Sequence, residues 1–341
     1  MRRILGLVLF LWLFSTLNAS AAAILISPGP TLAASPAALA AFNRAATTWG
    51  TLLSDPVTVT IDANLVSLAN PNVIGSTSTV LLQGSYATIR DSMVADAADE
   101  PDDTIVASLP TAAQFSAVVP TGFSLTGLIV ATKANLKALG FPGLDAAFGA
   151  RDATISFNSN FAFDFDNSDG VGAGLIDFET VALHEIGHAL GFISIVDMID
   201  ALVAQNTPTA VPFTTLDLFR FSTAPGLNPS TAAQFTTDPR MLVPGQAANF
   251  DDVAHEYGLS TGVNFGDGRQ ASHWKDDQLT GFHIGVMDPT LAFSTVAGLT
   301  SADLRALDVI GWDVPVVPEP ASATLIGCGV IAALRRRTRR H

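Results

Sequence analysis

Apolar and polar residues recur along the 341-residue chain in two different periods. A helical period predicts an amphipathic helix over residues 36–53, whose apolar positions are Leu39, Phe42, Ala46, Trp49 and Leu53. Strict alternation of apolar and polar residues predicts a half-buried strand over residues 56–61. The chain therefore opens with a helix followed by a strand.

The same two patterns predict further elements in mixed order. Strands are expected at residues 79–82 and 153–157, and helices at residues 86–97 and 131–138. This succession predicts an α+β fold, in which a twisted mixed sheet has helices behind it. No period of about 20–50 residues recurs, which argues against a repeat protein.

One further helix carries the main chemical signal, the sequence His184-Glu185-Ile186-Gly187-His188. Two histidines four residues apart lie one helical turn from each other, so both imidazoles can bind a single ion. Glu185 would lie beside that ion without being a ligand, where it can take a proton from an attacking water. The pattern is typical of catalytic zinc helices. The alternative is an apolar core helix whose two histidines bond to carbonyl groups.

The residues around this pattern favour the zinc interpretation. Asp177 is a suitable N-cap, and Gly191 supplies a stop where the chain can turn sharply. Apolar residues recur at helical spacing on the side away from the histidines, at Phe178, Ala182, Ile186 and Ala189. The sequence therefore predicts a capped, amphipathic metal-binding helix.

A catalytic zinc needs a third protein ligand, and the sequence leaves several candidates. No glutamate occurs between Glu185 and Glu256, which nearly excludes a glutamate from a following helix. Asp197 and Asp200 remain open as ligands. The other histidines of this region are His255, His273 and His283.

Two later segments bear on this choice, Ser272-His273-Trp274 and Gly285-Val286-Met287-Asp288-Pro289. Together with the HExxHxxG helix and a long insertion, they resemble the leishmanolysin-type metzincins, whose third histidine comes late and is followed by a Met-turn. The resemblance covers roughly residues 153–312. It implies that His184, His188 and His273 bind Zn2+ and that Met287 packs beneath them. His283 is then the second choice, and His255 is expected to be solvated.

The resemblance also implies a fold and an activity. The fold would be a metzincin-like zincin with an active-site helix and a C-terminal subdomain below the cleft. The activity would be that of a zinc endopeptidase acting on a protein or peptide, with Glu185 as general base. The chain departs from leishmanolysin proper because it lacks cysteines in this region and a long propeptide, so the substrate does not transfer.

Two other segments complete this part of the chain. A closing helix is expected within residues 299–312, where Thr300 and Asp303 form a capping-box pattern. The insertion, residues 195–269, contains a strand-like run at residues 216–221 and is expected to form the lower half of the cleft.

An acidic run at residues 164–170 raises calcium as a second ion. Its spacing fails, because Asp169 stands where a calcium loop needs glycine and Leu175 where it needs a glutamate. An ordinary acidic turn is the better interpretation.

Both ends of the chain read as targeting segments. Residues 1–23 have the basic start, apolar middle and small-residue end of a secretory signal peptide. Residues 317–341 join Pro318-Glu319-Pro320 to a short apolar run and five arginines, and resemble the PEP-CTERM sorting tail of Gram-negative bacteria. This resemblance implies processing by an exosortase, transient association with the inner membrane and delivery to the cell surface or medium. A permanent membrane anchor is the alternative.

Charge and cysteine content fit an exported protein. The two ends hold seven of the 17 Lys and Arg residues and one of the 31 Asp and Glu residues, so the part between carries a formal charge of about −20. That charge argues against nucleic acid as a partner. The single cysteine, Cys328, lies in the tail, so residues 24–316 are expected to fold without disulfides.

The predicted organisation is a signal peptide (1–23), a catalytic domain (24–316) and a sorting segment (317–341). Within the domain, residues 24–194 would form an N-terminal subdomain and residues 195–316 a C-terminal one. The competing hypothesis is a non-catalytic surface or matrix-binding protein that keeps the fold.

Overall fold

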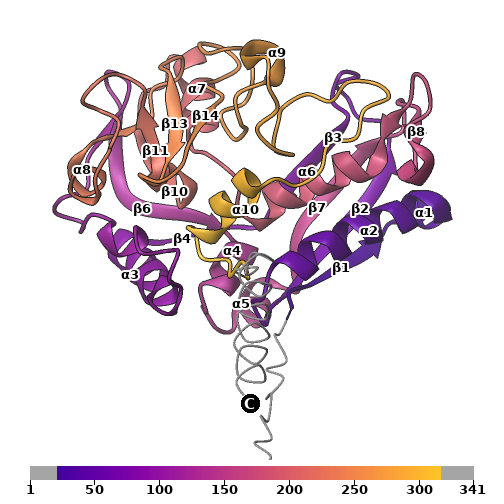
Figure 1. Cartoon of the computed structure of the whole chain (residues 1–341), viewed down its shortest axis with the longest axis horizontal. Helices are drawn as coiled ribbons and strands as arrows, with labels where there is room; N and C mark the ends of the chain where they lie inside the picture. Colours follow the sequence, from indigo (N-terminus) through magenta and orange to yellow (C-terminus); the bar gives the residue numbers. More distant parts are fainter. Residues whose placement is uncertain (1–20, 316–341) are drawn as a thin grey trace, which may run out of the picture.

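The computed structural model describes residues 21–315, which form a mixed α+β structure with several sheets (Figure 1). Residues 1–20 of the predicted signal peptide (1–23) and all of the predicted sorting tail (317–341) lie outside these residues, whereas Ala22 is buried and Ala23 begins the first strand. No helix in residues 21–315 is long and apolar enough to cross a membrane.

The first sheet is mixed and has the strand order β1-β2-β7-β3. Strands β1 (Ala23–Pro28), β2 (Thr58–Val66) and β7 (Arg151–Asn158) run parallel, and β3 (Gly75–Thr79) pairs antiparallel with β7 at the edge. The parallel order requires crossovers, which helices α1 (Pro30–Ala33) and α2 (Pro36–Leu52) supply between β1 and β2. The helices predicted at residues 36–53 and 86–97 are confirmed as α2 and α3 (Tyr86–Asp96).

Three smaller sheets extend the structure. One contains β10 (Ala210–Thr214), β6 (Ser124–Thr132) and β4 (Leu81–Ser85). Another contains, in order, β14 (Glu256–Leu259), β13 (Ala248–Asp251), β11 (Arg220–Ser222), β12 (Arg240–Met241) and β5 (Ala117–Val118). The last pairs β8 (Phe163–Asp164) with β9 (Ile176–Asp177). Two of these sheets take strands from both sides of residue 194, where the subdomain boundary was predicted.

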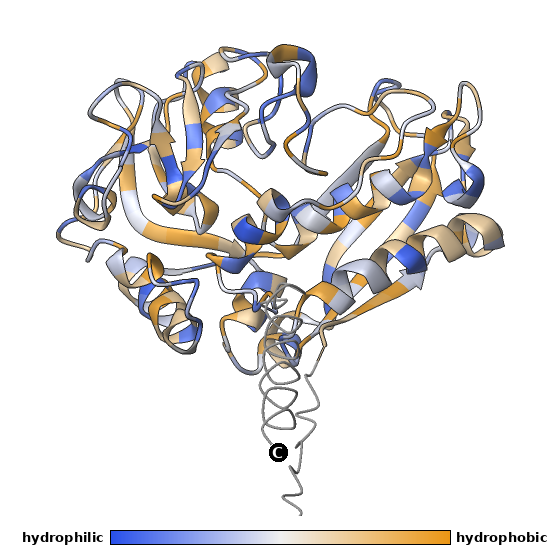
Figure 2. Cartoon of the chain, viewed as in Figure 1, coloured by the Kyte–Doolittle hydropathy of each residue, from blue (hydrophilic) through white to orange (hydrophobic). Residues whose placement is uncertain are grey.

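The remaining helices lie between and beside the sheets. They are α4 (Lys133–Ala138), α5 (Leu144–Phe148), α6 (Phe178–Leu190), α7 (Val196–Ala204), α8 (Ala232–Thr237), α9 (Asp277–Thr280) and α10 (Ser301–Asp308). Short 3-10 turns occupy Ala97–Asp99, Val106–Ser108, Asn167–Asp169 and Leu216–Phe219. In Figure 2 the long strand β6 is coloured mainly as apolar where it crosses the middle of the molecule, consistent with its largely buried second half.

Three predicted elements differ from the structure. The strand expected at residues 79–82 is divided at Val80, whose N–H donates to Asp152 of the first sheet while its carbonyl accepts from Lys133 beside the second. The chain thus passes from one sheet to the other at a single residue. The helix expected from residue 131 begins at Lys133, because Thr132 ends β6 and caps the helix through a bond from the Asn135 N–H.

The third difference concerns residues 216–221, which were expected to be strand-like. Residues Leu216–Phe219 form a 3-10 turn, and only Arg220 onward is a strand. Asp217 explains the turn, because its buried carboxylate accepts bonds from the N–H groups of Ile195 and Thr214. A strand would carry this carboxylate away from those donors.

Buried tryptophans fix the central helix α6 against the rest of the core. The indole of Trp49 on α2 donates to the carbonyl of Leu183, and the indole of Trp312 donates to the carbonyl of Leu190. Both tryptophans are fully buried. The bond to Leu190 also satisfies one of the carbonyls that a helix end leaves without an internal partner.

Several carboxylates lie close to one another around Arg305 of α10. Arg305 bonds to Asp103 and Asp308, while Glu100 has a buried Oε2 with no hydrogen-bond partner. Burial, followed by the negative charge of neighbouring carboxylates, raises the pKa of Glu100 to about 9 and that of Asp308 to about 8. Burial also raises the pKa of Asp96 to about 7.

These shifts predict that stability falls as pH rises. A carboxyl whose pKa is raised by folding holds its proton in the native state at a pH where the unfolded chain has already lost it. As pH rises from the ordinary pKa, about 4, to the native pKa, the free energy of unfolding therefore decreases. We therefore expect the thermal midpoint to decrease from pH 5 to pH 9. Glu100→Gln should flatten this decrease, and Asp91→Asn, which changes an exposed carboxylate on α3, should leave it unchanged. A Glu100→Gln slope equal to wild type would contradict the prediction.

Candidate metal centre

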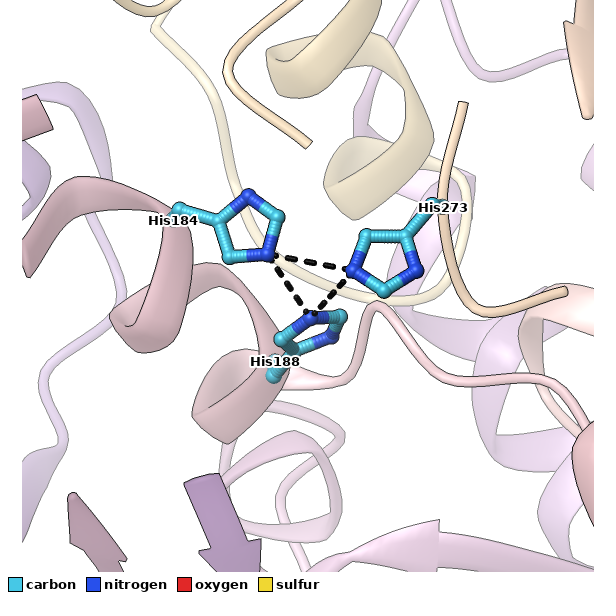
Figure 3. A group of neighbouring side chains, drawn as sticks. All are labelled: His184, His188 and His273. Atoms are coloured by element: carbon cyan, nitrogen blue, oxygen red, sulfur yellow. Dashed lines mark hydrogen bonds between the residues drawn. The ribbon is translucent and has the colours of Figure 1, made fainter. Parts of the chain in front are cut away.

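Three histidine side chains meet at one point of the structure (Figure 3). The Nε2 atoms of His184 and His188 on α6 lie 3.1 Å apart, and the Nε2 atom of His273 lies 3.1 and 3.2 Å from them. His273 comes from the loop between β14 and α9. The structure therefore brings together the three histidines that the sequence singled out as ligands, in a group that could hold a metal ion.

Each imidazole is oriented by a main-chain carbonyl on its other nitrogen. The Nδ1 atoms of His184 and His188 lie 2.8 Å from the carbonyl oxygens of Val286 and Phe192, and Nδ1 of His273 lies 3.1 Å from that of Gln270. A carbonyl can only accept, so Nδ1 carries the proton in each neutral ring. The Nε2 lone pairs then face the common centre, as metal-binding histidines require.

Burial keeps the rings of His188 and His273 neutral. It lowers the pKa of His188 to about 3 and that of His273 well below its ordinary value, and the positive charge that a neighbouring histidine would carry lowers both further. Neutral imidazole is the form that binds metal.

The spacing of the three nitrogens also fits one ion. Three inward-facing lone pairs cannot bond to one another, and a cation between them removes that repulsion. A tetrahedral ion about 2.0–2.1 Å from each nitrogen would place the nitrogens about 3.3 Å apart. The observed 3.1–3.2 Å is close to that value. The structure thus contains a candidate three-histidine metal site, whose ion it does not specify.

The caps of α6 are as predicted from the sequence. Asp177 is the N-cap and accepts from the Thr180 N–H and hydroxyl, at 3.0 and 2.6 Å. Gly191 ends the helix with φ +132°, in a backbone region that L side chains rarely adopt. Phe192 can then turn back so that its carbonyl reaches His188.

Met287 can pack against α6 because position 187 of that helix is glycine. A Cβ atom added at Gly187 would lie 2.3 Å from the Met287 sulfur, so only glycine leaves room for it. Met287 is almost fully buried, and its carbonyl accepts from the N–H of Trp274, the residue after His273. Met287 therefore packs against Gly187 of the histidine helix and is bonded to the segment that carries the third histidine.

A single buried carboxylate, that of Asp303, holds this region together. It accepts bonds from the N–H groups of Val286 and Met287 and from the indole N–H of Trp274, the last at 2.8 Å. It also accepts from the N–H of Thr300, which completes the predicted capping box of α10. A Cβ atom added at Gly285 would lie 2.4 Å from this carboxylate, so glycine is needed there.

The alternative aspartate ligands have other partners. Asp197 accepts from the N–H groups of Ala271 and Ser272 and thereby positions the loop before His273. Asp200 accepts from the N–H groups of Asn264 and Phe265. Neither joins His184 and His188 in a metal-capable group. Both aspartates instead bind later main chain to α7, at residues 264–265 and 271–272.

His255 and His283 do not reach the three-histidine group. His255 bonds to Asp252, at 3.1 Å, and its side chain is 47% exposed. His283 lies in a separate group with Asp277 and Asp288, where its Nδ1 is 4.0 Å from an Asp288 oxygen. That separation is wide for two ligands of one transition-metal ion, which lie about 3.3 Å apart when the metal–ligand bonds are about 2.1 Å.

The acidic run at residues 164–170 satisfies its own carboxylates. Asp164 accepts from the N–H groups of Asp166 and Gly172, and Asp166 accepts from that of Ser168. The bonds from Ser168 hold the pKa of Asp166 below its ordinary value. This run belongs to no metal-capable group among the described residues, and calcium gains no support from it.

Glu185 lies beside the histidines with its side chain directed toward the first sheet. It is 5% exposed, and its Oε2 accepts a 2.6 Å bond from the hydroxyl of Thr77 on β3. Burial raises the pKa of Glu185. Both residues and all three histidines line a cleft of about 690 Å³. Thr77 was missed from the sequence, because a lone threonine in a polar strand carries no motif.

Comparisons with protein-family models, curated proteins and solved structures find no match. The metal site therefore rests on the geometry described above.

The geometry predicts which histidine is needed for metal binding. His273→Ala should strongly reduce the metal bound per chain, because it removes one of three donors. His283→Ala and His255→Ala should keep the wild-type content. Elemental analysis of the purified variants measures this directly, and full metal content in the His273 variant would exclude His273 as a ligand.

Proposed function

We propose that this protein is an exported zinc-dependent endopeptidase with a metzincin-like architecture. The observation that carries the proposal is the juxtaposition of the three-histidine group with a carboxylate, Glu185, that is not a ligand, in one open cleft. The late third histidine and the methionine packed beneath the helix support the leishmanolysin-type layout.

Zinc is the ion that this donor set favours. Three neutral imidazoles with a fourth position left open are typical of catalytic zinc sites. When bound, zinc would polarise the scissile carbonyl and make water a stronger nucleophile.

The side chains of the protein would supply the proton transfer and hold the site. Glu185 would take the proton of the attacking water on its carboxylate and give it to the leaving amine. The carbonyls of Val286, Phe192 and Gln270 would hold the imidazoles in the metal-binding tautomer throughout.

The edge of the first sheet suits an extended peptide. Ile74 and Val80 share backbone bonds with β7, so in this antiparallel ladder the even residues of β3 face β7. The N–H and carbonyl groups of Gly75, Thr77 and Thr79 therefore face the open edge. These residues line the cleft, and a substrate strand could pair with them there. This supports a peptide substrate.

The alternative function is a non-catalytic protein that uses the same fold for binding. Glu185 argues against it, because a structural metal site needs no buried carboxylate beside the ion. Burying such a group costs free energy, and a role in proton transfer would account for its presence there.

The enzyme hypothesis predicts a separation of metal binding from turnover. Residues 24–316 should purify with about one zinc per chain, cleave casein or gelatin and lose activity with a chelator. Glu185→Ala should keep the zinc but lower turnover about a hundredfold or more. If wild type and Glu185→Ala are equally inert on every peptide library, the binding-protein alternative is favoured.

We also propose that residues 317–341 are a sorting signal removed by an exosortase-type enzyme. Pro318-Glu319-Pro320 precedes the apolar run, while five arginines follow it. Cationic residues stay on the cytoplasmic side of the inner membrane, so the acidic domain would lie outside and the membrane stage would be transient.

Changing Pro318, Glu319 and Pro320 to alanine should trap the full-length chain in the inner membrane, because the processing enzyme would lose its recognition sequence. Intact-mass analysis of the surface and medium fractions measures the outcome. Wild-type protein that retains residues 326–334 in those fractions would identify a permanent anchor instead.

A further inference from the structure

We infer that Thr77 is a positioning residue that fixes the carboxylate of Glu185 and connects it to the bound peptide. The inference rests on the proposed function and deepens it. Thr77 belongs to β3, more than 100 residues before Glu185 in the chain.

Both acceptors of the Thr77 hydroxyl belong to Glu185. Its Oγ1 lies 2.6 Å from Oε2 and 2.9 Å from the main-chain carbonyl oxygen of the same residue. A hydroxyl donating to an ionised carboxylate makes a short and comparatively strong bond. Thr77 thus holds the carboxylate against the backbone of its own helix, and restricts rotation of the Glu185 side chain.

The other carboxylate oxygen occupies space that Gly75 leaves free, two residues earlier on the same face of β3. A Cβ atom added at Gly75 would lie 2.5 Å from Oε1 and 2.9 Å from Cγ of Glu185. The carboxylate therefore occupies space that any larger residue would fill. Gly75 thus leaves room for the carboxylate, and the Thr77 hydroxyl holds it there.

The main chain of Thr77 faces a different neighbour. Its N–H and carbonyl point to the open edge of β3, where an extended peptide would pair. One residue would then bond to the substrate through its backbone and to the general base through its side chain. The distance between the scissile bond and the Glu185 carboxylate would be set through Thr77.

Thr77→Val tests this role because it replaces the hydroxyl with a methyl group and keeps the shape. We expect kcat to fall about tenfold to a hundredfold, with KM and zinc content unchanged, since only alignment of the base is lost. Thr77→Ser keeps the hydroxyl and should restore most of the activity. Ser78→Ala is the matched control, because it removes an exposed hydroxyl from the same strand on the opposite face.

Crystal structures of the Thr77 variants supply a readout that does not depend on activity. The Glu185 carboxylate should leave its position in Thr77→Val and keep it in Thr77→Ser. An unmoved carboxylate in Thr77→Val, or a wild-type kcat in that variant, would overturn the inference.

Glu185→Gln separates this inference from the proposed function. If wild type and Glu185→Gln are equally inert on every peptide, the peptidase proposal fails. The Glu185 positions in the two Thr77 crystal structures still decide in that case whether Thr77 holds the carboxylate.

Discussion

The buried carboxylate of Asp303 is the constraint on which the arrangement of the metal centre depends. It accepts bonds from the N–H groups of Val286 and Met287 and from the indole of Trp274. The carbonyl of Val286 in turn orients the imidazole of His184, and Trp274 directly follows His273 in the chain. A buried carboxylate that accepts several N–H bonds is destabilised when one of its donors moves away. The same carboxylate therefore caps α10 and helps to fix the segment that carries His273.

The methionine that packs against α6 adds a steric condition to this hydrogen-bonded one. The sulfur of Met287 occupies the space left by the absent side chain of Gly187, so the turn and the helix can approach only because that position is glycine. Val286, one residue earlier, orients His184 through its carbonyl. Two consecutive residues of one turn thus have separate roles, because Val286 orients His184 and Met287 packs against the helix.

Local signals in the sequence were sufficient for the helix and its caps. Asp177 and Gly191 perform the roles that their residue types predict, and the late histidine with its methionine turn led to His273. Long-range pairing had no such signal. The change of sheets at Val80 and the bond from Thr77 to Glu185 depend on which strands lie side by side, and that depends on the whole fold.

The order of these residues along the chain has a consequence for biosynthesis. The donors of the metal centre are up to 89 residues apart in the sequence, and the carboxylate that fixes the third one lies still later, at Asp303. A chain emerging from the ribosome can form α6 early. Closing the long loop between His188 and His273 comes afterwards and costs conformational entropy. An incomplete chain therefore has the metal-binding helix without the centre. The three histidines can come together only once nearly all of the described residues have been made.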